Sequence, residues 1–72
     1  MITEEILDKV AVFISDYAIS PDTIFLSEKY ANQLIDELHT TLGVEFEINE
    51  TTEFNGMQFI ITTKDMVEVG VI

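Results

Sequence analysis

The chain has 72 residues, which is enough for one domain and too few for two. It carries 14 acidic residues against three lysines and no arginine, so its net charge of -11 argues against binding to nucleic acids or to anionic membranes. The absence of cysteine excludes disulfides, thiolate nucleophiles and cysteine zinc sites. A hydrophobic fraction of 47% is too high for a disordered acidic tail.

Residues 3–18 form the first predicted element, an amphipathic helix. Thr3 is a candidate N-cap, and Glu4 and Glu5 suit the positive end of the helix dipole. Apolar side chains recur at helical spacing and predict one buried face: Ile6, Val10, Phe13, Ile14 and Tyr17. Pro21 and the residues around it favour a turn after this helix.

Residues 23–26 are a short apolar run that predicts a buried strand. Ser27 is then the expected N-cap of a second helix over residues 28–42, and Gly43 is suited to end it.

From Val44 the hydrophobic period changes to two, which predicts a half-buried strand over residues 44–48, with an irregular or bulged continuation after it. Asn55 and Gly56 favour a tight type I′ turn because both residues tolerate positive φ. Strands are expected over residues 57–63 and 67–71, separated by a short polar turn.

These elements predict a single α+β domain over residues 1–72, in the order αβαβββ. We expect two helices packed on one face of a small, mainly antiparallel sheet of three or four strands. The C-terminal strand is a candidate edge, whose open backbone groups could pair with another copy and produce a homo-oligomer.

A catalytic interpretation finds little support in this sequence. His39 lies in the last turn of the second predicted helix, and Asp36 lies one turn before it. No serine stands in a nucleophile elbow, and a histidine near a helix C-terminus is explained by the dipole. Three lysines provide little from which to build a clamp for phosphate or carboxylate substrates. We therefore predict a protein that is not an enzyme and has no catalytic residues.

Metal binding is a weaker interpretation of the acidic residues than a solvated strand face. Oxygen ligands suit calcium or magnesium, but the spacing of the glutamates matches no calcium loop. The three glycines are far apart and build no phosphate loop. We expect no metal site and no cofactor.

Two sets of residues are candidates for binding a partner protein. The acidic set consists of Glu45, Glu47, Glu50, Glu53 and Glu68. The apolar set, which could instead pack in the core or the hairpin, consists of Phe54 and Met57, with Phe25 and Tyr30 as further members.

Two stretches, "PDTIFLSEKYANQLIDEL" and "FNGMQFIITTKDMVEVGVI", resemble a strand-helix-hairpin segment of tailed-phage major capsid proteins. The resemblance covers about residues 21–72 and is carried by short, mostly hydrophobic motifs. It implies a phage or prophage origin and transfers no catalytic residue. The chain departs from the family because it lacks the long extended arm and the spine helix.

The leading functional hypothesis is a small acidic module, of inhibitor or DNA-mimic type, that binds a basic surface of a partner such as a nucleic-acid-binding protein. The alternative is a virion-associated or assembly protein that acts by oligomerisation. No apolar run approaches the roughly 18 residues of a membrane span, and the acidic N-terminal stretch lacks the basic region of a signal peptide. We therefore expect a soluble protein in the cytoplasm, that of the host if the chain is phage-encoded.

Overall fold

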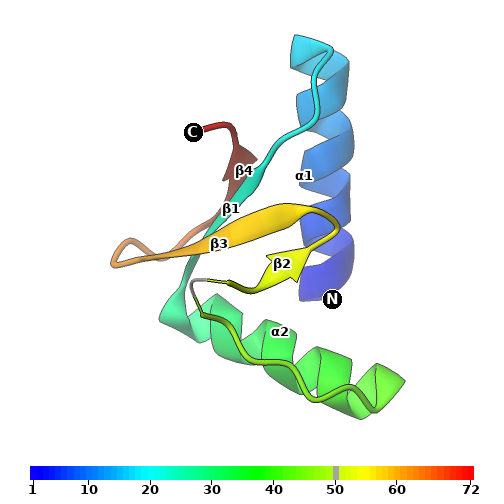
Figure 1. Cartoon of the computed structure of the whole chain (residues 1–72), viewed down its shortest axis with the longest axis vertical. Coiled ribbons are helices and arrows are strands. Elements are labelled where there is room, and N and C mark those ends of the chain that lie inside the picture. Colours follow the sequence, from blue (N-terminus) through cyan, green and yellow to red (C-terminus); the bar gives the residue numbers. More distant parts are fainter. Residues whose placement is uncertain (50) are drawn as a thin grey trace.

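The computed structural model describes residues 1–49 and 51–72, and in them it has two helices and four strands (Figure 1). Their bounds in chain order are α1 Ile2–Tyr17, β1 Thr23–Ser27, α2 Glu28–Leu42, β2 Glu53–Phe54, β3 Met57–Thr62 and β4 Val67–Gly70. The α+β class and the predicted order αβαβββ are confirmed.

The strands form one mixed sheet in the order β2-β3-β1-β4. The two outer pairings, β2 with β3 and β1 with β4, are antiparallel. The central pair, β1 with β3, is parallel, so the sheet is mixed, and the predicted antiparallel pairing holds for two of its three strand pairs. A parallel pair requires a crossover connection, and α2, the loop after it and the short strand β2 supply it here.

The predicted strand over residues 44–48 is wrong, because the structure has a loop there. The alternation of the side chains is nevertheless real: Phe46 and Ile48 are half-buried, whereas Glu45 and Glu47 are exposed. The Phe46 ring packs edge-on against Phe59, with ring centroids 5.9 Å apart. The alternation of buried and exposed residues therefore comes from a loop that packs against the core. The strand that pairs with β3 at this edge of the sheet is β2.

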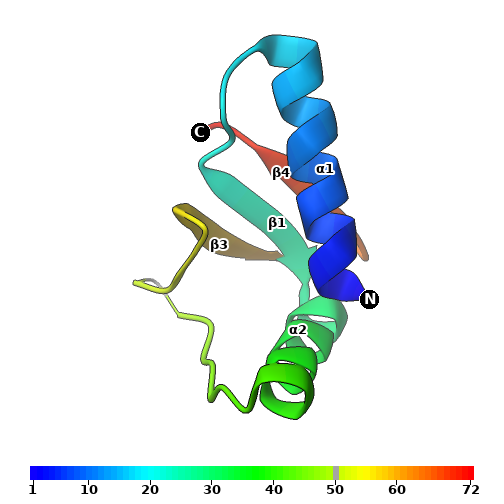
Figure 2. The same cartoon turned by 90° about the vertical axis from the view of Figure 1, so that its right-hand side faces the viewer.

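One face of the sheet carries the core, and both helices contribute to it (Figure 2). Ile24 and Leu26 of β1 are completely buried, and their neighbours across the sheet are Phe59 of β3 and Val67 and Val69 of β4. The helices add these buried side chains: Ile2 and Ile6 from α1, and Ala31, Leu34 and Leu38 from α2. This arrangement agrees with the predicted packing of both helices on one face.

The predicted buried face of α1 is correct only for its first half. Ile6 is completely buried, but Ile14 is 42% exposed and Tyr17 is 65% exposed. Both views show the C-terminal end of α1 projecting away from α2 (Figures 1 and 2). The amphipathic pattern therefore continues along a helix whose second half has less of the domain to pack against.

Two predicted caps differ from the observed ones. Helix α1 begins at Ile2, so Thr3 lies inside it and does not act as the N-cap residue. Ser27 occupies the N-cap position of α2, but its hydroxyl donates to Asp65 at 3.0 Å and does not cap the helix. Gly43 ends α2 as predicted, with a left-handed backbone and its N–H bonded to the carbonyl of His39.

The Asn55-Gly56 turn adopts the expected left-handed backbone, with φ of 51° and 79°. A side chain at position 56 would meet no atom within 4 Å, so substitution there is opposed by backbone strain alone. We expect Gly56→Ala to lower the free energy of unfolding by about 1 kcal/mol in chemical denaturation. Gly56→Asn should cost less, because asparagine tolerates this conformation, and equal losses for both variants would contradict this account.

Candidate functional site

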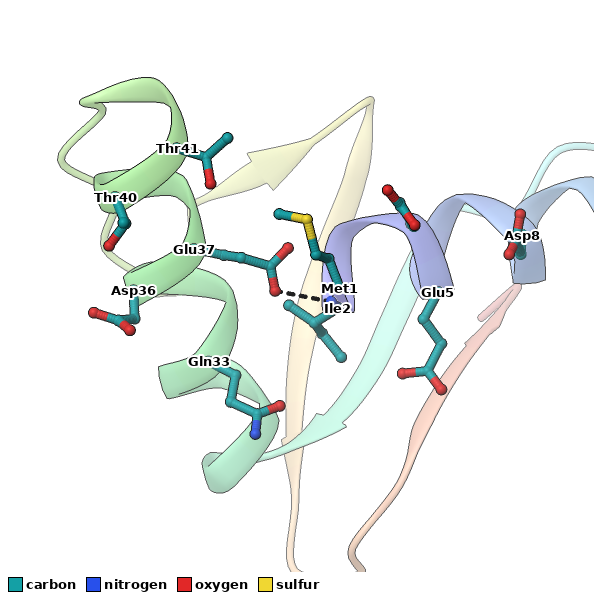
Figure 3. Close-up of a pocket in the computed structure, with 10 residues that line it drawn as sticks. Met1, Ile2, Glu5, Asp8, Gln33, Asp36, Glu37, Thr40 and Thr41 are labelled. Carbon is teal, nitrogen blue, oxygen red and sulfur yellow. Dashed lines mark hydrogen bonds between the residues drawn. The ribbon is translucent and has the colours of Figure 1, made fainter.

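A groove of about 720 Å³ lies between the first half of α1 and the exposed side of α2 (Figure 3). The residues that line it are Met1, Ile2, Glu4, Glu5, Asp8, Gln33, Asp36, Glu37, Thr40 and Thr41. We call it the acidic groove, because five of the described residues that line it are carboxylates and none is a lysine or histidine.

Helical spacing positions these carboxylates on the two walls. Glu4 and Asp8 lie four residues apart and therefore share one side of α1. On α2 the same spacing relates Gln33 to Glu37, whose side chains point toward α1, whereas Asp36 points away from it and forms the outer rim (Figure 3). Each helix alone presents an ordinary acidic face, and packing of the helices makes a groove between the two faces.

Glu37 joins the two walls of the acidic groove. Its carboxylate accepts hydrogen bonds from the backbone N–H of Ile2 at 2.8 Å and of Thr3 at 3.1 Å, and from the Thr3 hydroxyl at 2.9 Å (Figure 3). The first N–H groups of a helix have no partner within the helix, so Glu37 of α2 caps α1 across the tertiary structure. This contact sets how α1 enters the domain beside α2.

These contacts determine the ionisation of Glu37. Burial acts to raise its pKa, but the hydrogen bonds from Ile2 and Thr3 favour the charged form, and the net effect is a pKa below the ordinary value of 4.5. Glu37 is therefore negatively charged at neutral pH, although it is half-buried. The inner wall of the acidic groove keeps its charge as a consequence of the helix cap.

The acidic set proposed from the sequence is not one surface. Glu45 and Glu47 are exposed on the loop after α2, and Glu53 is exposed on β2. Glu68 lies on β4, at the opposite edge of the sheet from β2, so its grouping with the others is corrected. It forms an ion pair with Lys9, at 3.3 Å between Nζ and Oε1. Glu50 lies outside the described residues.

The two apolar candidates pack inward. Met57 is 2% exposed and belongs to the core, so its interpretation as a surface contact does not hold. Phe54 is half-buried, and its ring centroid lies 6.4 Å from that of Phe59. A hairpin strand at the end of a small sheet uses its aromatic residue to close the core.

His39 is exposed on α2 and does not line the acidic groove, although Asp36 does. In the part of the chain that the structure describes, no side-chain hydrogen bond joins His39 to Asp36. Across residues 1–49 and 51–72, no three His, Cys, Asp or Glu side chains are placed to hold a metal ion.

Sequence reasoning missed the acidic groove. The signal for it was present in the four-residue spacing of Glu4 with Asp8 and of Gln33 with Glu37, but that spacing is also typical of a solvated helix face. No periodicity within one helix indicates which other helix it will contact.

Comparisons of the chain with protein-family models, with curated proteins and with solved structures found no match. The resemblance to tailed-phage capsid proteins thus stays an expectation from sequence motifs. Among the described residues, neither α1 nor α2 combines the length and the apolar character needed to cross a bilayer.

Proposed function

We propose that this protein is a small, non-enzymatic binding module that uses the acidic groove to bind a basic surface of a partner protein. The observation that carries the proposal is that five carboxylates from two helices line one groove, four of them within it and Asp36 on its outer rim, with no lysine or histidine side chain among the described residues that line it. A lysine or arginine side chain of a partner would find several carboxylate oxygens there.

The charge of the whole molecule supports the same conclusion. Within the described residues, ion pairs link Lys9 to Glu68 and Lys29 to Asp65, and no other carboxylate is paired with a lysine. Most of the net charge of -11 is therefore uncompensated and attracts a cationic surface over a distance. Such attraction raises the association rate and weakens as salt is added.

A partner that normally binds nucleic acid fits this chemistry. Its binding surface is arranged to neutralise phosphates, and a row of carboxylates can take their place. Occupation of that surface would compete with the nucleic acid, so the protein would act as an inhibitor of DNA-mimic type. A phage or prophage origin, implied by the capsid-like motifs, would place this activity in the host cytoplasm.

The acidic groove can be tested by neutralising its charge. We expect the double variant Glu5→Gln, Asp8→Asn to weaken binding to a capped lysine-rich peptide about tenfold at low salt, a change of about 1.4 kcal/mol. Isothermal titration calorimetry at several salt concentrations measures both the affinity and its salt dependence. The wild-type affinity should fall steadily as the salt concentration rises.

The matched control is Glu45→Gln, Glu47→Gln, which removes the same number of charges from the exposed loop after α2. This variant should lose much less affinity. An equal loss in both variants would show that total charge alone, and not the acidic groove, governs binding. Affinity that does not change with salt would contradict the proposed function itself.

A second candidate function is assembly by oligomerisation, and one observation favours it. In the part of the chain described by the structure, β4 pairs with β1 alone and forms an edge of the sheet. Val71 and Ile72, which follow β4, are 49% and 78% exposed. Light scattering at micromolar concentration tests this function, and a strict monomer contradicts it.

A further inference from the structure

A second groove, of about 340 Å³, lies on the other half of α1, between this helix and the edge strand β4. It is lined by Lys9, Val12, Phe13, Asp16, Tyr17, Glu68 and Val69. We call it the edge groove. Figure 2 shows α1 passing in front of β4, and the residues that line the groove come from these two elements.

The backbone of β4 has unused hydrogen-bonding positions on this side. The N–H of Ser27 donates to the carbonyl of Met66, and Glu68 lies opposite Phe25 in the antiparallel pair. Because the backbone groups of successive residues point to opposite sides of a strand, those of Val67 and Val69 point away from β1. These groups can accept a further strand.

The helix wall of the edge groove carries three apolar or aromatic side chains, together with the charged residues Lys9 and Asp16. Val12 is 59% exposed and Tyr17 is 65% exposed, and the ring of Phe13 lies 4.7 Å from that of Tyr17 between centroids. Side chains of an added strand that pointed to the helix side of the sheet would contact these residues. The core of the domain does not use them.

The charges around the edge groove indicate what kind of segment could bind there. Asp16 and Glu68 are exposed acidic residues of the groove, and the cation beside Glu68 is Lys9 of the same chain. The Lys9–Glu68 pair lies at the surface and contributes little to stability, so an incoming lysine or arginine can replace Lys9 at little cost. A second copy of this chain would instead bring another net charge of -11 to the same edge.

We infer that the edge groove accepts an extended segment of a basic partner protein, which adds to β4 as a further strand of the sheet. Apolar side chains of this segment face Phe13 and Tyr17 below α1, and the alternating basic side chains lie beside Glu68 on the opposite face. The inference rests on the proposed function, since the partner is the same basic protein. It adds a strand-pairing contact to the contact made at the acidic groove.

The experiment uses the full chain and two capped peptides of about six residues with the same composition. In one peptide lysine and valine alternate, and in the other the lysines and valines form two blocks. We expect the alternating peptide to bind more tightly, and its addition to shift the backbone amide signals of Val67 and Val69 in NMR spectra. Equal affinity of the two peptides, or unchanged amide signals, would overturn the strand addition.

Two charge reversals locate the site. Glu68→Lys should weaken binding of the alternating peptide about tenfold, whereas Glu53→Lys, an equal change on the opposite edge strand, should have much less effect. Tyr17→Ala, at an exposed position, should also weaken binding without loss of the fold. Equal effects of Glu68→Lys and Glu53→Lys would overturn the inference.

The outcomes separate this inference from the proposed function. Salt-sensitive binding of both peptides with equal affinity, lost in the acidic-groove variant, would refute the edge groove and leave the proposed function standing. If neither peptide binds in a salt-dependent way, both fail. If the free protein is a dimer whose Val67 and Val69 amides change on dilution, a second copy occupies the edge, and the inference is wrong.

Discussion

Replacement of Leu34 by alanine is expected to remove a large share of the free energy of unfolding of this protein. Leu34 of α2 is completely buried in the core between the helices and the sheet. Deletion of such a side chain typically costs about 2 to 5 kcal/mol, because it removes packing and leaves a cavity. A domain of this length has a total stability of roughly 4 to 11 kcal/mol, so one deletion consumes a large share of it.

Chemical denaturation followed by circular dichroism measures this loss. The matched control is Leu42→Ala, the same substitution in the same helix at a residue that is 65% exposed. It should change the free energy of unfolding by less than about 0.5 kcal/mol. Similar losses for both variants would mean that α2 does not pack through Leu34 as the structure shows.

Glu37→Gln is expected to lower the free energy of unfolding by about 1 to 2 kcal/mol at neutral pH. The substitution removes the charge that strengthens the hydrogen bonds from Ile2 and Thr3, and it weakens the cap that joins α1 to α2. Asp36→Asn is the control, because Asp36 is exposed on the same helix and points away from α1 (Figure 3). It removes one charge without touching the cap and should have little effect.

The difference in stability between wild type and Glu37→Gln should depend on pH, which gives an independent check of the cap. Because the pKa of Glu37 is lower in the folded state than in the unfolded chain, its contribution is complete above the ordinary value of 4.5. The contribution is lost as the pH falls through the lowered pKa of the folded state, where the carboxylate becomes protonated. Denaturation at about pH 7 and about pH 3 should therefore show a larger difference between wild type and Glu37→Gln at the higher pH. A difference that does not shrink in acid would contradict the charged cap.

Glu37 also connects stability with the candidate site. The same carboxylate caps α1 and lines the inner wall of the acidic groove, so a Glu37 variant alters both the fold and the surface. Glu5 and Asp8 are exposed, and in the described part of the chain their side chains make no hydrogen bond to α2. Substitutions at these two positions therefore change the acidic groove without changing the cap of α1.

Local physical chemistry determined the elements of this protein. Helices and strands are separated at the predicted turn residues, which are Pro21, Gly43 and the Asn55-Gly56 pair. The helices and the later strands occur where their periodicities predicted them. The large excess of carboxylates over lysines determined an acidic surface regardless of the fold. These properties depend on neighbouring residues or on composition alone, so no distant contact is needed to derive them.

Tertiary contacts decided which of these elements meet. The parallel pairing of β1 with β3, the loop in place of a strand at residues 44–48, the Glu37 cap and both grooves all depend on residues far apart in the sequence. The alternation of Phe46 and Ile48 satisfied a strand pattern, yet packing against Phe59 explains it equally well. A periodicity shows which side of a segment is buried, but the partner that buries it is selected by the packing of the whole chain.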